Sequence, residues 1–260
     1  MIPKIIHYCW FGGKEKPESV KRCINSWKLH LPDYEIIEWN ENNYDINSHQ
    51  FVKEAYETKK FGFIVDVLRM HTLNELGGIY LDTDVEFIRS LPDYFLEQKA
   101  FGSFEVGNLL NVGLLASEKN GDFVHHMLNV YKEKHFIIEG KPNLNFTGPI
   151  GTTEYLKSIG FLMNGTFEQK DIFTIYSADY FSPKDYKTGL CEITDNTVCI
   201  HLYDATWVDE KLQKENQLKD RLIKSILDCK TFMSNRAILG LSYRTLKIKS
   251  IKQFISVYLK

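Results

Sequence analysis

The sequence predicts an α/β protein: a mostly parallel β-sheet flanked by helices, with a helical C-terminal extension. Three observations predict this fold class. Short apolar runs alternate with helix-like segments through the first third of the chain, as they do when right-handed crossovers join parallel strands. The middle of the chain mixes further strand and helix patterns. Beyond about Asp209 the apolar spacing is helical to the end.

The first third contains five elements in alternation. Residues 4–10 (KIIHYCW), 34–39 (YEIIEW) and 79–84 (IYLDTD) are short apolar runs typical of buried strands. Residues 18–32 carry apolar side chains at helical spacing and end at a proline. Residues 61–78 are apolar nearly all round and end in Gly-Gly, which is a helix C-cap signal.

The middle of the chain is less regular. Residues 122–134 are predicted to be a helix, and residues 146–160 a loop that opens a helix ending at Gly160. Four more segments are predicted to be strands, residues 100–105, 109–117, 172–183 and 196–207.

Charge divides the chain into two expected domains, residues 1–213 and a basic helical extension at 214–260. Residues 211–260 contain twelve Lys and Arg against three Asp and Glu, a net charge of +9, so the first 210 residues carry −11. The segment 241–260 reads as an amphipathic helix with a basic flank, which predicts contact with an anionic membrane surface. The alternative is that its apolar stripe packs on the first domain and its lysines are solvated.

Composition is that of a globular protein, with 43% hydrophobic and 25% charged residues and a net charge of −2. No apolar stretch approaches the roughly 18 residues that span a bilayer, and the start of the chain does not resemble a signal peptide. The five cysteines are irregularly spaced and are expected to be reduced thiols. We therefore expect a cytoplasmic protein, peripheral at the inner face of the plasma membrane.

The strongest local signal is the pair Asp82 and Asp84, directly after the apolar strand ending at Leu81. An unpaired buried carboxylate costs several kcal/mol, so such groups are paired, bound to metal or placed at a rim. Hard oxygen ligands suit Mg²⁺ or Mn²⁺ holding phosphate oxygens. The alternative is a turn with two solvated aspartates.

The preceding helix carries a second polar pair, Asp66 and Arg69, three residues apart on one face. Because the rest of that helix is apolar, this face is predicted to adjoin a polar cavity; the alternative is a surface ion pair. His201 ends an apolar strand and is a candidate metal ligand, or else a core or rim histidine. Trp10 precedes a Gly-Gly loop and is a candidate platform for a nucleobase, or else the edge of a core.

These segments occur together in a known family. The runs IPKIIHYCWFGG, DVLRMHTLNELGGIYLDTDV, FTGPIG and IHLYDATW resemble, in order and approximate spacing, the DXD-containing sugar-binding glycosyltransferases, glycosyltransferase family 32. That family is related to the catalytic domain of glucosylating toxins, and the resemblance covers about residues 1–210. It implies a GT-A-type (Rossmann-like) fold and metal-dependent, retaining transfer of a sugar from a nucleotide donor, in bacteria for capsular or other surface polysaccharides.

The resemblance also implies roles for individual residues. Asp82, Asp84, Arg69 and Asp66 would be the catalytic groups, and Asp84, His201 and Asp82 the metal ligands. The nucleotide sugar and acceptor would be bound by His7, Trp10, Tyr80, Asn111, Thr147, Gly148, Thr206 and Trp207. The family usually has Ser before the final Trp, so Thr206 is a departure that leaves its contact with metal or phosphate less secure.

The expected function is transfer of a sugar from a nucleotide sugar, with UDP-sugar preferred, to a glycan acceptor that is lipid-linked. The expected cofactor is Mn²⁺ or Mg²⁺, and no nucleic-acid partner is expected. Two alternatives stay open. Haloacid-dehalogenase-type phosphatases also carry D-x-D after a strand, but their later acidic pair has no counterpart here. A non-catalytic sugar-binding module would keep the fold but would not need both aspartates.

Overall fold

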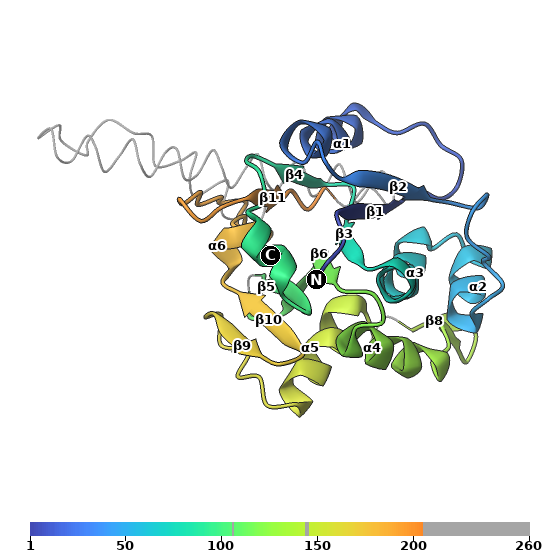
Figure 1. Ribbon diagram of the computed structural model, residues 1–260. Helices are drawn as coiled ribbons and strands as arrows, with labels where there is room; N and C mark the ends of the chain where they lie inside the picture. The colour runs from blue at the N-terminus through green and yellow to red at the C-terminus, as the bar shows by residue number, and fades with distance from the viewer. Residues whose placement is uncertain (106, 144–145, 205–260) are drawn as a thin grey trace, which may run out of the picture. The chain divides into compact units, whose positions relative to one another are not determined.

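The computed structural model describes residues 1–105, 107–143 and 146–204. Its centre is a seven-stranded sheet in the order β2-β1-β3-β6-β5-β10-β9 (Figure 1). The strands are β1 Ile5–Cys9, β2 Glu35–Trp39, β3 Gly78–Leu81, β5 Ala100–Phe104, β6 Leu110–Ser117, β9 Glu168–Lys170 and β10 Phe173–Tyr176.

Strand direction follows from the length of the connections. β1 is parallel to β2 and β3, and β5 is parallel to β10. β6 is antiparallel to both of its neighbours, and β9 is antiparallel to β10. Residues 105–109 between β5 and β6, and 171–172 between β9 and β10, are too few for the crossover that parallel strands require. Five of the seven strands still share one direction, which confirms the predicted mostly parallel sheet.

Helices cover both faces of this sheet (Figure 1). One apolar core packs the sheet against α2 Gln50–Glu57, α3 Phe61–Leu76, α4 Asp122–Lys132 and α5 Gly148–Ser158. A second core packs it against α1 Glu18–His30, the 3₁₀ helix Asp93–Glu97, α6 Ala178–Phe181 and a small antiparallel sheet of β4 Val85–Phe87 and β11 Cys199–His201. A further hairpin pairs β7 Ile137–Ile138 with β8 Lys141–Pro142. The predicted α/β class with flanking helices is confirmed.

The central helix α3 explains why its sequence is apolar nearly all round. It contacts α2 and α4 as well as strands β1 and β3, so several of its faces are buried. It ends at Gly77, whose N–H donates to the Leu73 carbonyl at a positive φ of 68°. Gly78 also has a positive φ, and a Cβ there would lie 2.5 Å from the Ile5 carbonyl oxygen, so strand β3 can follow directly only with glycine.

Three expectations need correction or stay open. The strand expected over residues 172–183 is confined to β10, because the chain turns at Ser177 into the short helix α6. Helix α2 was not expected; His49 caps it by accepting the N–H of Phe51. Residues 205–260 lie outside the described residues, so the domain boundary after residue 213 and the helical extension stay predictions. Among the described helices, none is long and apolar enough to cross a membrane.

Candidate functional site

The turn after β3 presents the two aspartates. β3 ends at Leu81, and the Asp82 N–H donates to the Gly113 carbonyl on β6 (2.8 Å). The Val85 N–H donates back to the Asp82 carbonyl (3.1 Å), so the chain turns between Asp82 and Asp84 before β4 begins. Because β1 and β3 are parallel neighbours, this turn lies at the same sheet edge as Trp10, which follows β1.

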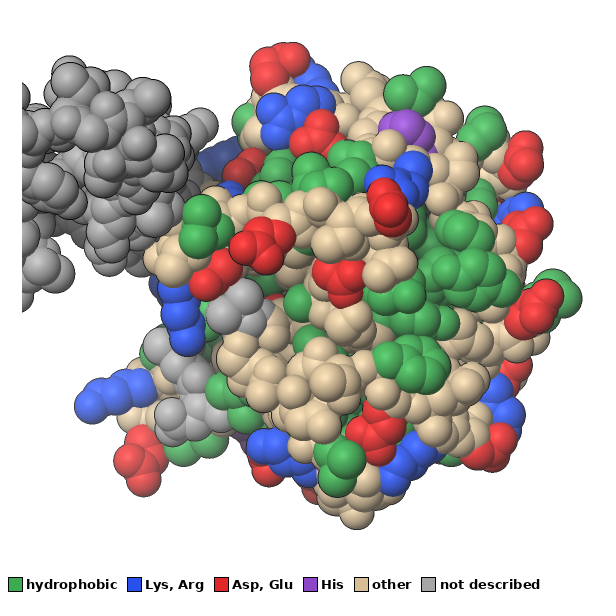
Figure 2. Space-filling view, turned by 90° about the vertical axis from the view of Figure 1, so that its left-hand side faces the viewer, with side chains coloured by type: hydrophobic (Ala, Val, Ile, Leu, Met, Phe, Trp, Pro, Cys, Tyr) green, Lys and Arg blue, Asp and Glu red, His purple; other side chains and the backbone are tan. Residues whose placement is uncertain are grey.

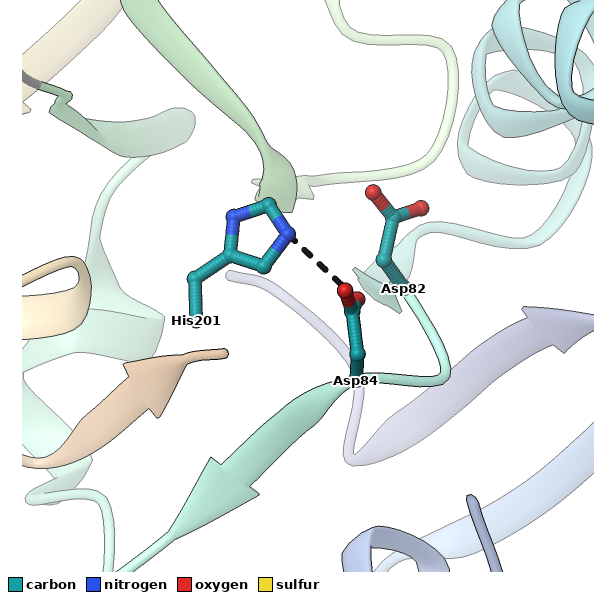
Figure 3. Close-up of side chains that lie close together, drawn as sticks. All are labelled: Asp82, Asp84 and His201. Atoms are coloured by element: carbon teal, nitrogen blue, oxygen red, sulfur yellow. Dashed lines mark ion pairs between the residues drawn. The ribbon is translucent and has the colours of Figure 1, made fainter. Parts of the chain in front are cut away.

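Strand β11 brings a histidine to the same turn. His201 is opposite Val85 in the β4–β11 register, and the Leu202 N–H donates to the Asp84 carbonyl (2.8 Å). His201 Nε2 lies 3.3 Å from Asp84 Oδ1. One ligand atom each of Asp82, Asp84 and His201 falls within a 4.8 Å cluster, and Figure 3 shows Asp84 directed at the histidine with Asp82 beside it.

The donor set of this cluster fits a divalent cation. Two carboxylates and one imidazole offer oxygen and nitrogen ligand atoms, and these atoms converge from the turn after β3 and from β11. Carboxylate oxygens suit Mg²⁺ and Mn²⁺, and an added imidazole favours Mn²⁺ over Mg²⁺. The three residues that the sequence predicts as metal ligands are thus brought together.

Electrostatics in the cluster point the same way. Burial alone would lower the pKa of His201, but the adjacent Asp84 carboxylate outweighs it and the pKa is raised. Burial acts to raise the pKa of Asp84, whereas the His201 charge and the backbone N–H of Asp204 (2.9 Å) lower it overall. The pocket therefore stabilises a positive charge beside an ionised Asp84, a requirement that a divalent cation meets.

The predicted pair on α3 lies directly behind the turn. Arg69 Nη1 lies 3.3 Å from Asp66 Oδ1, and Nη2 lies 3.2 Å from Asp82 Oδ1. The Arg69 side chain is only 2% exposed and its guanidinium stacks on the Tyr80 ring (4.6 Å). Arg69 therefore holds Asp82 from behind, and its burial rules out the alternative of a surface ion pair.

Asp66 is held by a second contact. Its Oδ2 accepts the N–H of Gly148, the first residue of α5 (3.0 Å), next to Thr147 at the N-cap. A Cβ on Gly148 would lie 2.4 Å from Asp66 Oδ1, so only glycine allows this approach. Burial raises the pKa of Asp66 to about 6, with Arg69 and the Gly148 N–H opposing the rise. The predicted residues Asp66, Arg69 and Gly148 are thus buried together, with the partly exposed Thr147 beside them.

The remaining predicted site residues differ in burial and in the contacts that they make. Trp10 is partly exposed, and its Nε1 donates to the Lys14 carbonyl (2.6 Å), which closes the loop after β1. Tyr80 is buried beneath Arg69. His7 is fully buried; its Nδ1 accepts from Trp39 and its Nε2 contacts the Gly77 carbonyl (2.8 Å), so it joins β1, β2 and the end of α3. Thr206 and Trp207 lie outside the described residues.

Three residues near the cluster were not found from the sequence. The Tyr203 ring stacks on His201 (centroids 3.9 Å apart), although its backbone has a strained positive φ of 56°. Tyr203 donates to Glu105 Oε2 (3.3 Å) and bonds the Ser182 hydroxyl (2.7 Å). Glu105 follows β5, which runs in the direction of β3, so the strand-end rule that singled out Asp82 would also have found it. Burial raises the pKa of Glu105.

A family model described as "Capsular polysaccharide synthesis protein" matches residues 1–137, more than half of the chain. The chain belongs to this family. It is also similar to inositol phosphoceramide mannosyltransferase 3 of Schizosaccharomyces pombe, with 36% identity in an alignment of length 98 that covers 35% of the chain and 26% of that protein.

A second similarity is to Subversion of eukaryotic traffic protein A of Legionella pneumophila, with 26% identity in an alignment of length 119 that covers 35% of the chain and 18% of that protein. The matches thus span about a quarter of one relative and less than a fifth of the other. Solved structures with a similar fold include the PaToxG glycosyltransferase (TM-score 0.48, 19% identity, 61% of this chain and 70% of that one). The glycosyltransferase GlyE of Streptococcus pneumoniae TIGR4 is another, with a TM-score of 0.45 and 13% identity; the match covers 89% of this chain and 64% of that one.

For this member of the capsular polysaccharide synthesis family, the predicted relationship to glycosyltransferases is confirmed at the level of that broad class. Assignment to glycosyltransferase family 32 stays a prediction, as do the roles of the individual site residues.

Proposed function

We propose that this protein is a metal-dependent, retaining glycosyltransferase that moves a sugar from a nucleotide sugar to a glycan acceptor in surface polysaccharide synthesis. The observation that carries the proposal is the convergence of Asp82, Asp84 and His201 at the carboxyl edge of β1 and β3. In open α/β sheets this edge is where ligands bind. Membership of the capsular polysaccharide synthesis family supports the acceptor class.

Asp84, His201 and Asp82 are the residues that would hold Mn²⁺ or Mg²⁺. When bound, the cation would neutralise the negative charge that develops on the leaving diphosphate. The buried Arg69 would fix the Asp82 carboxylate through its ion pair with Asp82 Oδ1. Asp66 would in turn fix Arg69 and the N-terminus of α5.

The nucleotide would bind beside Trp10, whose partly exposed ring lies at the end of β1. A single aromatic platform suits a small pyrimidine base, which favours a UDP-sugar as the donor. Retention is most simply achieved if the acceptor attacks from the same face as the departing diphosphate, because that route needs no nucleophilic carboxylate at the anomeric carbon.

The phosphatase alternative would make Asp82 a nucleophile. Its Oδ1 is instead paired with Arg69, and among the described residues no lysine bonds to Asp82 or Asp84. The deciding experiment is turnover of a panel of nucleotide sugars and a phosphate monoester with Mn²⁺. Hydrolysis or transfer of one nucleotide sugar supports the transferase. Turnover of the monoester alone identifies a phosphatase, and nucleotide-sugar binding without turnover identifies a binding module.

The lipid-linked acceptor and the membrane contact are proposed from the sequence of residues 214–260, which lie outside the described residues. Figure 2 shows one face of the molecule, on which acidic and basic side chains are interspersed and no area is uniformly basic. The proposed contact with an anionic leaflet rests on the net charge of +9 that the sequence of residues 211–260 carries. We expect the protein to cosediment with phosphatidylglycerol vesicles at low salt, and truncation after Asn235 to abolish this. No cosedimentation of the full chain would remove the membrane proposal and leave the enzyme unaffected.

A further inference from the structure

The imidazole of His201 is held by a residue that the sequence assigns to sugar binding. Asn111 on β6 is fully buried, and its Oδ1 lies 3.0 Å from His201 Nδ1. The same Oδ1 accepts the backbone N–H of Gly113 (3.0 Å). The oxygen of Asn111 thus faces the histidine and the strand backbone rather than an open surface.

These two bonds determine which His201 nitrogen carries the hydrogen. The Gly113 N–H can only donate, so the Asn111 atom beside it is the amide oxygen and not the nitrogen. An amide oxygen can only accept, so His201 Nδ1 is the donor in the second bond. A neutral imidazole carries one N–H, so with that hydrogen on Nδ1 the lone pair is on Nε2, which lies 3.3 Å from Asp84 Oδ1. Without a cation, Nε2 carries a second hydrogen toward the carboxylate; a cation shared with Asp84 would take the place of that hydrogen, while the Nδ1–H stays on Asn111.

Gly113 contributes twice to the same arrangement. A Cβ at this position would lie 2.5 Å from His201 Cε1 and 2.7 Å from Nδ1, so the ring occupies the space that any side chain would fill. The Gly113 carbonyl also accepts the N–H of Asp82 (2.8 Å). One residue of β6 therefore fixes the backbone of one proposed ligand and leaves room for the ring of another.

The side-chain amide of Asn111 also has a buried nitrogen, Nδ2, that lacks a hydrogen-bond partner among the described residues, and this unfavourable feature supports a specific role for the residue. A buried amide with one unsatisfied end is unfavourable compared with an apolar side chain, so Asn is explained here by what its oxygen does.

We propose that Asn111 and Gly113 form a seat on β6 that fixes the Nδ1–H tautomer and the position of His201, so that Nε2 is presented to a divalent cation shared with Asp84 and Asp82. Both are positioning residues, and neither has to touch the sugar. The inference rests on the proposed cation site. Partners that orient a ligating histidine through its other nitrogen commonly contribute 10–100-fold to metal affinity.

The first test measures Mn²⁺ affinity from the electron paramagnetic resonance signal of free Mn²⁺. Asn111→Leu removes the acceptor at similar size and should weaken Mn²⁺ binding about 10–100-fold. Gly113→Ala should weaken it as well, because the ring must move. Asn111→Asp keeps an acceptor for Nδ1 and should retain binding. Ser117→Ala, at the far end of the same strand, is the matched control and should bind Mn²⁺ as the wild type does.

The second test needs no variant. A two-bond ¹H–¹⁵N correlation spectrum of the wild type saturated with Zn²⁺, a diamagnetic cation, should show the His201 hydrogen on Nδ1. A hydrogen on Nε2, or an Asn111→Leu variant that binds Mn²⁺ as tightly as the wild type, overturns the seat while the cation site stands. A wild-type protein that binds no Mn²⁺ overturns the cation site itself, and with it the purpose of the seat.

Discussion

The described residues contain two carboxylate–histidine pairs, and they differ in how the carboxylate is surrounded. Glu54 on α2 pairs with His135 (2.8 Å), and its two oxygens also accept from Gln50 (2.8 Å) and the backbone N–H of Ile137 (2.9 Å). Asp84 pairs with His201 beside a second carboxylate, Asp82.

The two histidines differ as well. The His135 side chain is 60% exposed, whereas that of His201 is 9% exposed and its Nδ1 is already bound to Asn111. In the first pair both oxygens of Glu54 already accept hydrogen bonds, and these bonds join α2 to the start of β7. The second brings two carboxylates together at a sheet edge, where Arg69 pairs with Asp82 and His201 pairs with Asp84. The proposed cation site therefore differs from the Glu54–His135 pair in having a second carboxylate beside the histidine.

The largest expected effect is on turnover. Asp84→Asn should reduce sugar transfer or nucleotide-sugar hydrolysis by about 10³-fold or more, since a cation contributes several kcal/mol to stabilising the leaving diphosphate. Steady-state kinetics with Mn²⁺ in excess measure this, and circular dichroism establishes that the variant is folded. Full activity of the folded variant would remove Asp84 from the mechanism.

A matched pair of histidine variants tests the comparison itself. His201→Gln should raise the Mn²⁺ concentration needed for half-maximal activity by about 10–100-fold, because a ligand of the cation is lost. His135→Gln removes the histidine of the Glu54–His135 pair and should leave that concentration unchanged. Equal responses of the two variants would show that the pairs are not functionally different.

The proposed nucleobase platform gives a smaller effect. Trp10→Ala should weaken binding of the nucleoside diphosphate by about 1–3 kcal/mol, the usual contribution of a base–aromatic stack. Isothermal titration calorimetry measures the dissociation constant. If it does not change, Trp10 serves only to close its loop through the Lys14 carbonyl.

The Glu54–His135 pair should affect stability rather than function. Burial acts to raise the pKa of Glu54, but its hydrogen bonds outweigh burial and lower the pKa from 4.5 to about 2. A lowered folded-state pKa contributes stability above the unfolded value, and that contribution is lost as the pH falls toward 2.

Glu54→Gln should therefore lower the free energy of unfolding by about 1–2 kcal/mol at neutral pH, after discounting for solvent screening. The difference from the wild type should shrink below pH 4.5. Urea unfolding across this range measures it, and a difference independent of pH would show that the ionised carboxylate is not responsible.

The sequence predicted those parts of the fold and the site that depend on residues close together in the chain. The alternation of strands and helices, the glycine end of α3 and the turn of Asp82 and Asp84 after β3 each follow from adjacent residues. The pairing of β4 with β11 does not, because it joins Val85 to His201 across 116 positions and neither short strand has a distinctive pattern.

The contacts that the site side chains make with one another could not be predicted from the sequence either. Arg69 and Asp66 were identified as a polar pair, but their spacing does not reveal that Arg69 bridges to Asp82 beneath the turn. Asn111 was identified as a binding residue, but only the structure shows its oxygen on His201. Tyr203 gave no signal because its role depends on a left-handed backbone conformation that tyrosine rarely adopts.

The most direct measurement is calorimetric titration of Mn²⁺ into the purified wild-type, Asp84→Asn and Glu54→Gln proteins. The account predicts one saturable cation per chain in the wild type, unchanged binding in Glu54→Gln, and loss of binding in Asp84→Asn. Equal Mn²⁺ binding by the wild type and a folded Asp84→Asn, or no binding by the wild type, would contradict the central claim that Asp82, Asp84 and His201 form a cation site.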